Sequence, residues 1–343
     1  MDITLDVRAL LAAFSATGVL SVAAAQYLTK RLLDHRLSKD LKDYDAGINE
    51  KLAVHKAGLD QMLSDAKLAS EARWKKELDD YLGERSAERD YRAEAKKRLY
   101  LAVGPLRFQL FVAAAEFANR VSRIGDGKYS YDMSLGGYFG QSTVYRLVRV
   151  LAVGELIERQ IAFADFAVDP EMRVLLKFKR QAFLALSSHR VSLGHPQEDW
   201  GQQTQHIFYD VLAIIASALI VQDTPTSPSR VLRFDEFASM VAAGKGLSAL
   251  DPLPRLITGF SIDSKPILWL RLVALAQLCE GLLARLGTDV GLESDAIDVD
   301  AMLQATRDPH VLGHMEAYRD ALGGFRSAVD DALVVSAAAP PAP

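Results

Sequence analysis

The sequence is nearly without cysteine, and this lack limits its chemistry. A single cysteine, Cys279, in 343 residues excludes an internal disulfide framework and any zinc site built from several cysteines. Cys279 lies in the apolar run LVALAQLCEGLLARL, which favours a buried thiol without a catalytic role. The net charge is also small, at −4, so the chain lacks the positive excess that nucleic-acid binding requires. We therefore expect no nucleic-acid partner.

The chain also lacks the sequence motifs of common enzymes. The glycine-rich stretch at residues 125–142 contains neither a phosphate-binding GxxxxGK[ST] pattern nor a GxGxxG pattern. His310 and His314 are four residues apart, a spacing that can bind zinc, but the HExxH order is missing. Adjacent Asp235 and Glu236 are expected to stabilise a helix N-terminus. We predict no catalytic residue, no cofactor and no metal site, and an enzyme of unidentified class is kept only as a third interpretation.

Near the start of the chain, residues 9–29 carry no charge, and a bilayer is crossed by about 20 apolar residues. Lys30, Arg31 and Arg36 follow directly, and basic residues beside a span stay in the cytoplasm. We predict a single-pass anchor in the cell (inner) membrane, with residues 1–8 outside and the bulk of the chain in the cytoplasm. Two alternatives stay open: a cleaved signal peptide, for which VAAAQ offers a cleavage pattern, and a soluble amphipathic or core helix.

Residues 30–98 are densely charged with nearly balanced signs, which is typical of a long solvated helix. Apolar side chains recur in it at steps of three and four, as in a coiled-coil seam. We expect the chain to form homo-oligomers through this seam, and the anchor and this helix to form one rod of about 100 Å. A single solvated helix held by ion pairs is the alternative. The predicted seam consists of Leu37, Leu41, Tyr44, Ile48, Leu52, Leu59 and Met62.

From residue 99 the sequence becomes apolar enough to require burial, and Pro105 is expected to kink or restart the helix. Helix-period runs follow, without the alternation of a sheet. The predicted fold is all-α, with a single N-terminal transmembrane helix continuing into a long coiled-coil-like helix, then a globular multi-helix domain at residues 99–335. Residues 336–343 are expected to be a disordered tail. The runs cover about 142–165, 170–188, 201–222, 233–243, 265–287 and 310–334.

A polar loop, SSHRVSLGHPQEDW at residues 187–200, separates two of the apolar runs. Loops on rigid scaffolds often carry function, so this loop is the predicted partner or ligand surface. These features predict a membrane-anchored, self-associating scaffold or sensor whose cytosolic domain binds an unknown protein or small ligand. A membrane-acting effector whose transmembrane helices assemble into a pore when triggered is the alternative. The candidate loop residues are His189, Arg190, His195, Glu198 and Asp199.

Overall fold

The structure, a computed structural model, is predominantly helical, which confirms the all-α class. The predicted anchor at residues 9–29, the tail at 336–343 and the seam residues Leu59 and Met62 lie outside the described residues. The described residues form two compact units. The first unit contains the residues up to Pro105 together with Asp169, and the second contains all residues from Leu106 onward except Asp169. The structure describes residues 36–38, 41, 44–45, 47–56, 71–127, 132–162, 169–225, 227–288, 291–292 and 296–329.

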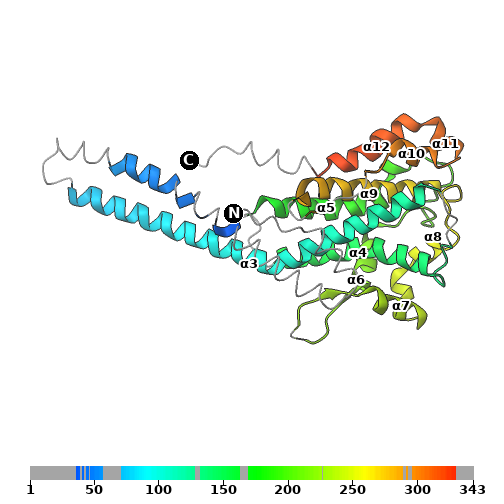
Figure 1. Ribbon diagram of the computed structural model, residues 1–343, viewed down its shortest axis with the longest axis horizontal. Coiled ribbons are helices and arrows are strands. Elements are labelled where there is room, and N and C mark those ends of the chain that lie inside the picture. The colour runs from blue at the N-terminus through cyan, green and yellow to red at the C-terminus, as the bar shows by residue number, and fades with distance from the viewer. Residues whose placement is uncertain are drawn as a thin grey trace, which may run out of the picture. The chain divides into compact units, whose positions relative to one another are not determined.

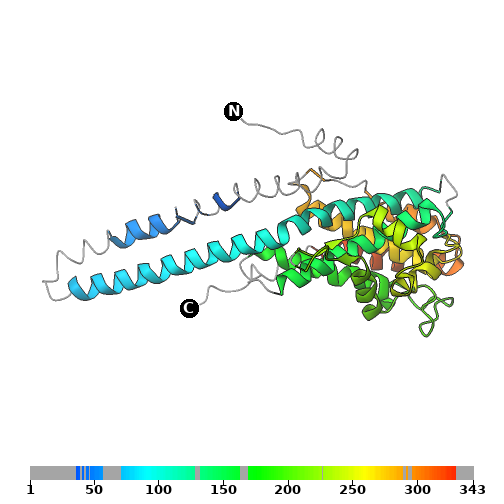
Figure 2. The ribbon, with the colours of Figure 1, turned by 90° about the horizontal axis from the view of Figure 1, so that it is seen from below.

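In the first unit, helical residues between 36 and 56 lie beside the long helix α3 (Glu71–Gly125; Figures 1 and 2). Asp45 Oδ1 is 3.2 Å from Nη1 of Arg89. In one straight helix these two residues would lie about 66 Å apart, at about 1.5 Å per residue. This segment of the chain therefore folds back on itself and does not form the expected single rod.

The described part of the predicted seam belongs to the segment that lies beside α3. Its described members are half-buried, whereas most residues between them are exposed. Helix α3 also has half-buried residues at intervals of four or seven positions, which match the spacing of the seam. They are Leu78, Leu82, Arg89 and Ala93. The described members of the seam thus lie on one partly buried face of their segment. The half-buried members of the seam are Leu37, Leu41, Tyr44, Ile48 and Leu52.

Helix α3 continues through Pro105, where the sequence predicted a kink or a new start. Proline removes the backbone N–H that would bond to the carbonyl of residue 101. Leu101 is 64% exposed, so water can reach this part of the helix. Beyond Pro105, Phe111 and Phe117 are buried, as the apolar sequence predicts.

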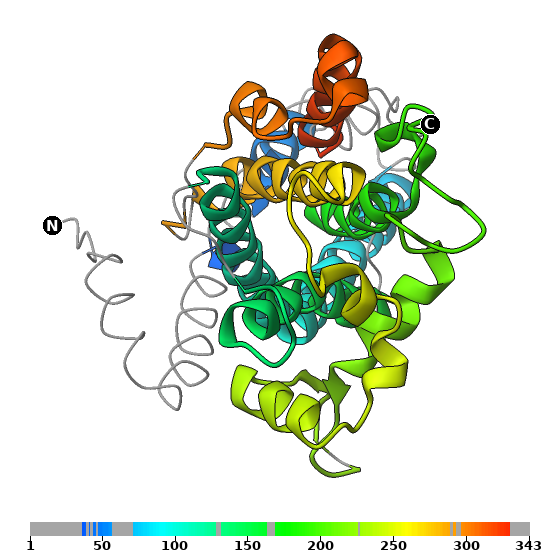
Figure 3. The same ribbon diagram turned by 90° about the vertical axis from the view of Figure 1, so that its right-hand side faces the viewer.

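The second unit is a helical bundle around α9 (Pro266–Leu286), which packs between α5 (Pro170–Ser187) and α12 (Met315–Ser327; Figure 3). Every residue of α9 except Ala284 and Arg285 is buried. Helix α4 (Tyr138–Ile161) packs against α5 and α6 (Tyr209–Ala218). The last turns of α3 join α4 through Glu116 and Arg149, whose side chains lie 2.9 Å apart.

Short elements complete the second unit, including two strands that the sequence did not indicate. Ile220 pairs with Val231 and Val221 with Arg230 in an antiparallel ladder. Helix α7 begins directly after it, and Glu236 accepts a hydrogen bond of 2.7 Å from the Arg233 N–H, as expected for a carboxylate at a helix N-terminus. The elements are β1 (Ile220–Val221), β2 (Arg230–Val231), α7 (Phe234–Ala242), η3 (Leu247–Leu250), α8 (Leu253–Ile257), α10 (Val299–Gln304) and α11 (Pro309–Gly313).

Two described helices are long and apolar enough to cross a membrane, judged by length and composition alone. They are the part of α3 from Leu78 to Gly125 and the whole of α9. In the most apolar stretch of α9, 94% of the residues are buried, against 50% in that of α3. The apolar surface of α9 is therefore used inside the bundle.

Candidate functional site

The predicted loop begins where α5 ends and is shaped by local hydrogen bonds. The Ser188 hydroxyl oxygen accepts a bond of 3.1 Å from the Arg190 N–H and so starts the short helix η2 (His189–Val191). Leu193 and Gly194 then take positive φ angles of 46° and 74°. This left-handed conformation suits glycine and is strained for leucine, so the chain turns sharply at this point.

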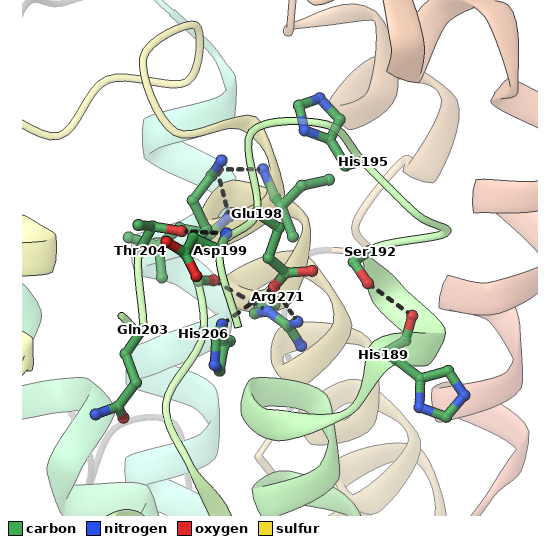
Figure 4. A network of polar contacts seen from close by, with 12 residues as sticks. His189, Ser192, His195, Glu198, Asp199, Gln203, Thr204, His206 and Arg271 are labelled. Carbon is green, nitrogen blue, oxygen red and sulfur yellow. Dashed lines mark hydrogen bonds and ion pairs between the residues drawn. The ribbon is translucent and has the colours of Figure 1, made fainter. Parts of the chain in front are cut away.

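A buried ion pair fastens the loop to α9 (Figure 4). Arg271 Nη2 lies 2.6 Å from Glu198 Oε1, and the two side chains are 0% and 1% exposed. The same guanidinium donates to the Ser188 carbonyl at 2.7 Å and to the Gln205 carbonyl at 3.0 Å. One side chain of α9 thus binds the start of the loop, a residue near its end and the segment that follows it. Removing water from two charges is costly, and these additional bonds compensate the cost.

His206 lies beside this ion pair and is fully buried. Its Nδ1 is 3.4 Å from Glu198 Oε1, and neither ring nitrogen makes a hydrogen bond of normal geometry. Burial lowers the pKa of His206 and the nearby Arg271 adds to this effect, although Glu198 opposes it. The indole of Trp200 covers the imidazole, with ring centroids 4.1 Å apart. His206 is therefore a neutral, buried part of the loop interior at pH 7.

A second set of contacts fastens the loop to α11 and α12. His195 Nε2 is 3.0 Å from Asp308 Oδ1, and the Tyr318 hydroxyl donates to the Ser192 carbonyl at 3.0 Å. Burial alone would raise the pKa of Asp308, but the Val311 N–H and His195 outweigh it and lower the pKa below its usual value. The carboxylate therefore stays charged, and it binds both His195 of the loop and the Val311 N–H at the start of α11.

The outer side of the loop forms an open depression with a volume of about 720 Å³ against α12. Leu193 and Trp200 are the large apolar side chains of its lining, and they are 37% and 38% exposed. Exposed aromatic and apolar side chains on a fixed backbone are typical of binding surfaces. The depression is lined by His189, Arg190, Ser192, Leu193, Gly194, Trp200, Asp320 and Ala321.

The structure separates the five predicted site residues into inner and outer ones. Glu198 and His195 have buried side chains and hold the loop in place. His189 and Arg190 are exposed and line the depression. Asp199 accepts a bond of 2.8 Å from the Gly201 N–H and stabilises a turn. The five residues therefore belong to one loop but not to one site.

Sequence reasoning missed the residues that fix the loop from outside it, namely Arg271, Asp308 and Tyr318. One signal was present, because Arg271 is the one charge in the first two-thirds of an otherwise apolar helix. Such a charge needs a partner when it is buried. The sequence does not say which residue is the partner, because Glu198 lies 73 positions away.

The histidine pair lies near the same loop. His314 Nδ1 is 2.9 Å from the His310 carbonyl oxygen, and the two rings lie 4.5 Å apart. Burial lowers the pKa of His310, and the nearby His195 and His314 lower it further. Among the residues that the structure describes, no group of three or more histidine, cysteine or acidic side chains could hold a metal ion.

No protein family, no curated protein and no solved structure matches the chain at a significant level.

Proposed function

We propose that the chain is a membrane-anchored, self-associating scaffold or sensor whose helical domain binds a protein or small ligand at the depression beside η2. One observation carries this proposal: the loop is fixed on its inner side and presents exposed apolar side chains on its outer side. Glu198 and His195 fasten it from within, whereas Leu193 and Trp200 stay exposed. A binding surface prepared in this way loses little entropy when a partner docks.

The membrane part of the proposal rests on the sequence. Residues 9–29 are uncharged and long enough to span a bilayer, and the basic residues that follow favour a cytoplasmic side for the rest of the chain. In the structure the apolar helix α9 is enclosed by the bundle. This enclosure supports the assignment of the anchor to residues 9–29.

Self-association is proposed through the hairpin that α3 forms with residues 36–56. Its apolar residues, such as Leu41 and Ile48, are only half-buried by the neighbouring helix. Two such hairpins could pack as four helices and complete the burial of these side chains. This arrangement differs from the continuous rod of anchor and coiled coil that the spacing alone suggested.

In the pore-forming alternative, the span at residues 9–29 assembles with its copies in other chains when the domain is triggered. Helix α9 is also long and apolar enough to cross a membrane, by length and composition alone. To enter a membrane, α9 would have to leave the bundle with Arg271 and Glu280, which are both buried in it. Charged side chains in hydrocarbon are costly. Leakage of a dye from cells that express the full chain, and its absence when residues 1–30 are deleted, would support the pore instead of the scaffold.

The binding surface is tested by photo-crosslinking in the full chain. A photo-reactive residue replaces Leu193, which lines the depression, and in a matched control it replaces Ile214, which is 57% exposed on α6. We expect a reproducible adduct at position 193 that is absent at 214 and is lost in Trp200→Ala. The same adducts at both positions, or none at 193, would contradict the proposal.

A further inference from the structure

The depression beside η2 is lined by charges of both signs that the described residues do not use. Arg190 on η2 and Asp320 on α12 both line it, and both are exposed. Within the part of the chain that the structure describes, neither side chain forms an ion pair, with the other or with any third residue. Arg319, which precedes Asp320, pairs with Asp300 at 2.7 Å instead. One cation and one carboxylate in the same depression are therefore available to a ligand.

The contacts of Arg190 place its guanidinium close to Asp320. Arg190 Nη2 lies 3.7 Å from the position that a Cβ would take at Gly324, and the guanidinium carbon is 6.0 Å from the centre of the Phe325 ring. Gly324 follows Asp320 by four positions in α12. Residues four apart share one face of a helix, with Cβ atoms about 5–6 Å apart. The guanidinium therefore reaches α12 about one helical turn beyond Asp320, which lets one small molecule contact both charges.

The same depression also offers apolar contacts. Leu193, Trp200 and Ala321 belong to its lining. The Trp200 ring is held on one side by the imidazole of His206, with the ring centroids 4.1 Å apart, and 38% of the residue stays exposed. The volume of about 720 Å³ falls within the range of about 300–1,000 Å³ that small-molecule sites have. These features suit a small ligand with an apolar body.

We propose that the depression binds a small zwitterion with a large apolar side chain, the chemistry of a free aromatic or branched aliphatic amino acid. The guanidinium of Arg190 donates to the carboxylate of the ligand, its ammonium group pairs with Asp320, and its side chain contacts Leu193 and Trp200. A simple anion would be repelled by Asp320 and a simple cation by Arg190, so the two charges together select a molecule that carries both. This inference rests on the proposed binding surface and assigns it a small ligand.

The test is a titration of the full chain with phenylalanine and three analogues, followed by the NMR signals of the added compound. Each analogue lacks one feature: phenylalaninamide has no carboxylate, N-acetylphenylalanine has no ammonium group, and alanine has no ring. We expect phenylalanine to bind about two- to fivefold more tightly than either of the first two, the range of one exposed ion pair. Alanine should bind about tenfold more weakly, because it buries no ring.

Variants assign each charge of the ligand to its residue. Arg190→Gln should weaken the binding of phenylalanine about two- to fivefold and leave phenylalaninamide unaffected, since the amide has no carboxylate to lose. Asp320→Asn should weaken phenylalanine equally and should not weaken N-acetylphenylalanine. The matched controls are Arg180→Gln on α5 and Asp210→Asn on α6, which remove the same charges at exposed positions outside the depression and should change nothing.

Three results would overturn the proposal: no binding of phenylalanine, equal affinity for phenylalanine and its analogues, or equal weakening by the control variants.

The ligand class and the binding surface can fail separately. A protein adduct at position 193 together with no binding of phenylalanine refutes the zwitterion and leaves the protein-binding surface in place. Binding of phenylalanine that depends on Arg190 and Asp320, together with no protein adduct at position 193, supports the zwitterion and refutes a protein partner at this depression.

Discussion

Helix α9 and the first-unit part of α3 both contain charged residues, but the charges have different roles. In α9, Arg271 is buried, and its partners Glu198, Ser188 and Gln205 are fixed. In α3, Arg92 pairs with Glu88 one turn away, and both side chains are exposed. Water screens the exposed pair, so it contributes little, whereas a buried charge is costly without its partner. The burial of a charge therefore decides its effect on the fold.

The largest effect is expected for Arg271→Met. This change leaves Glu198 buried without its cation and should lower the free energy of unfolding by about 3–5 kcal/mol. Urea unfolding of the full chain, followed by near-ultraviolet circular dichroism, measures it. The matched control is Arg285→Met, at the half-buried end of the same helix. An equal loss of unfolding free energy in both variants would mean that burial does not distinguish these charges. Adding Glu198→Gln to Arg271→Met should restore part of the lost stability, because it removes the unpaired buried charge.

A similar loss is expected for Phe111→Ala in the buried half of α3. The ring is 1% exposed, and a large cavity in a core costs about 3–5 kcal/mol. Tyr91→Ala is the control, because Tyr91 lies in the same helix and is 61% exposed. Thermal melts of the two variants compare the buried and the solvated halves of one helix. If Tyr91→Ala lowers the melting temperature as much as Phe111→Ala does, the two halves do not differ as described.

A smaller, pH-dependent loss is expected for the loop interior. Burial lowers the pKa of His206 and of His310 in the folded chain, so below the ordinary histidine pKa the unfolded chain binds more protons. Stability should therefore fall as the pH falls from 7.5 to 5.5. Denaturation curves at both pH values measure the loss, and His206→Gln should reduce it. An unchanged slope in that variant would show that the pKa of His206 is the same in the folded and the unfolded chain.

The lowered pKa of Asp308 affects the stability of the chain in a separate, more acidic pH range. Its contribution to stability is present above the ordinary aspartate pKa and is lost only as the pH falls toward the lower folded value. The two pH ranges do not overlap, so protonation of Asp308 itself does not contribute to the change between pH 7.5 and 5.5.

The smallest effect is expected for Arg92→Gln on the solvated face of α3. The pair with Glu88 is exposed on both sides, so its loss should be hard to detect in a thermal melt and should vanish in 1 M salt. A shift comparable with that of Phe111→Ala would show that this face is covered by a partner.

The helices of the bundle could be predicted because each buries a continuous apolar face. The run predicted at 170–188 became α5, and the run at 265–287 became α9. The run predicted from residue 201 becomes helical only at Tyr209, because Gln205 and His206 serve the loop interior. Periodicity finds faces, but it does not assign residues that bond to distant groups.

The hairpin and the loop contacts could not be predicted for a related reason. The pair of Asp45 with Arg89 joins positions 44 residues apart, and nothing local to either residue indicates the other. In the loop, His189 faces outward and His195 inward, and an irregular backbone has no period from which this could be deduced. The sequence therefore located the candidate loop but not its two sides.

The most direct test of the whole arrangement is the extraction of membranes with alkaline carbonate. Full-length chain and a variant lacking residues 1–30 are compared after expression in the same cells. We expect the full chain to stay in the membrane pellet and the variant to be released, because residues 9–29 are the proposed anchor and α9 is buried in the bundle. Retention of the variant would assign a membrane span to α9 or α3, and release of the full chain would refute the anchor.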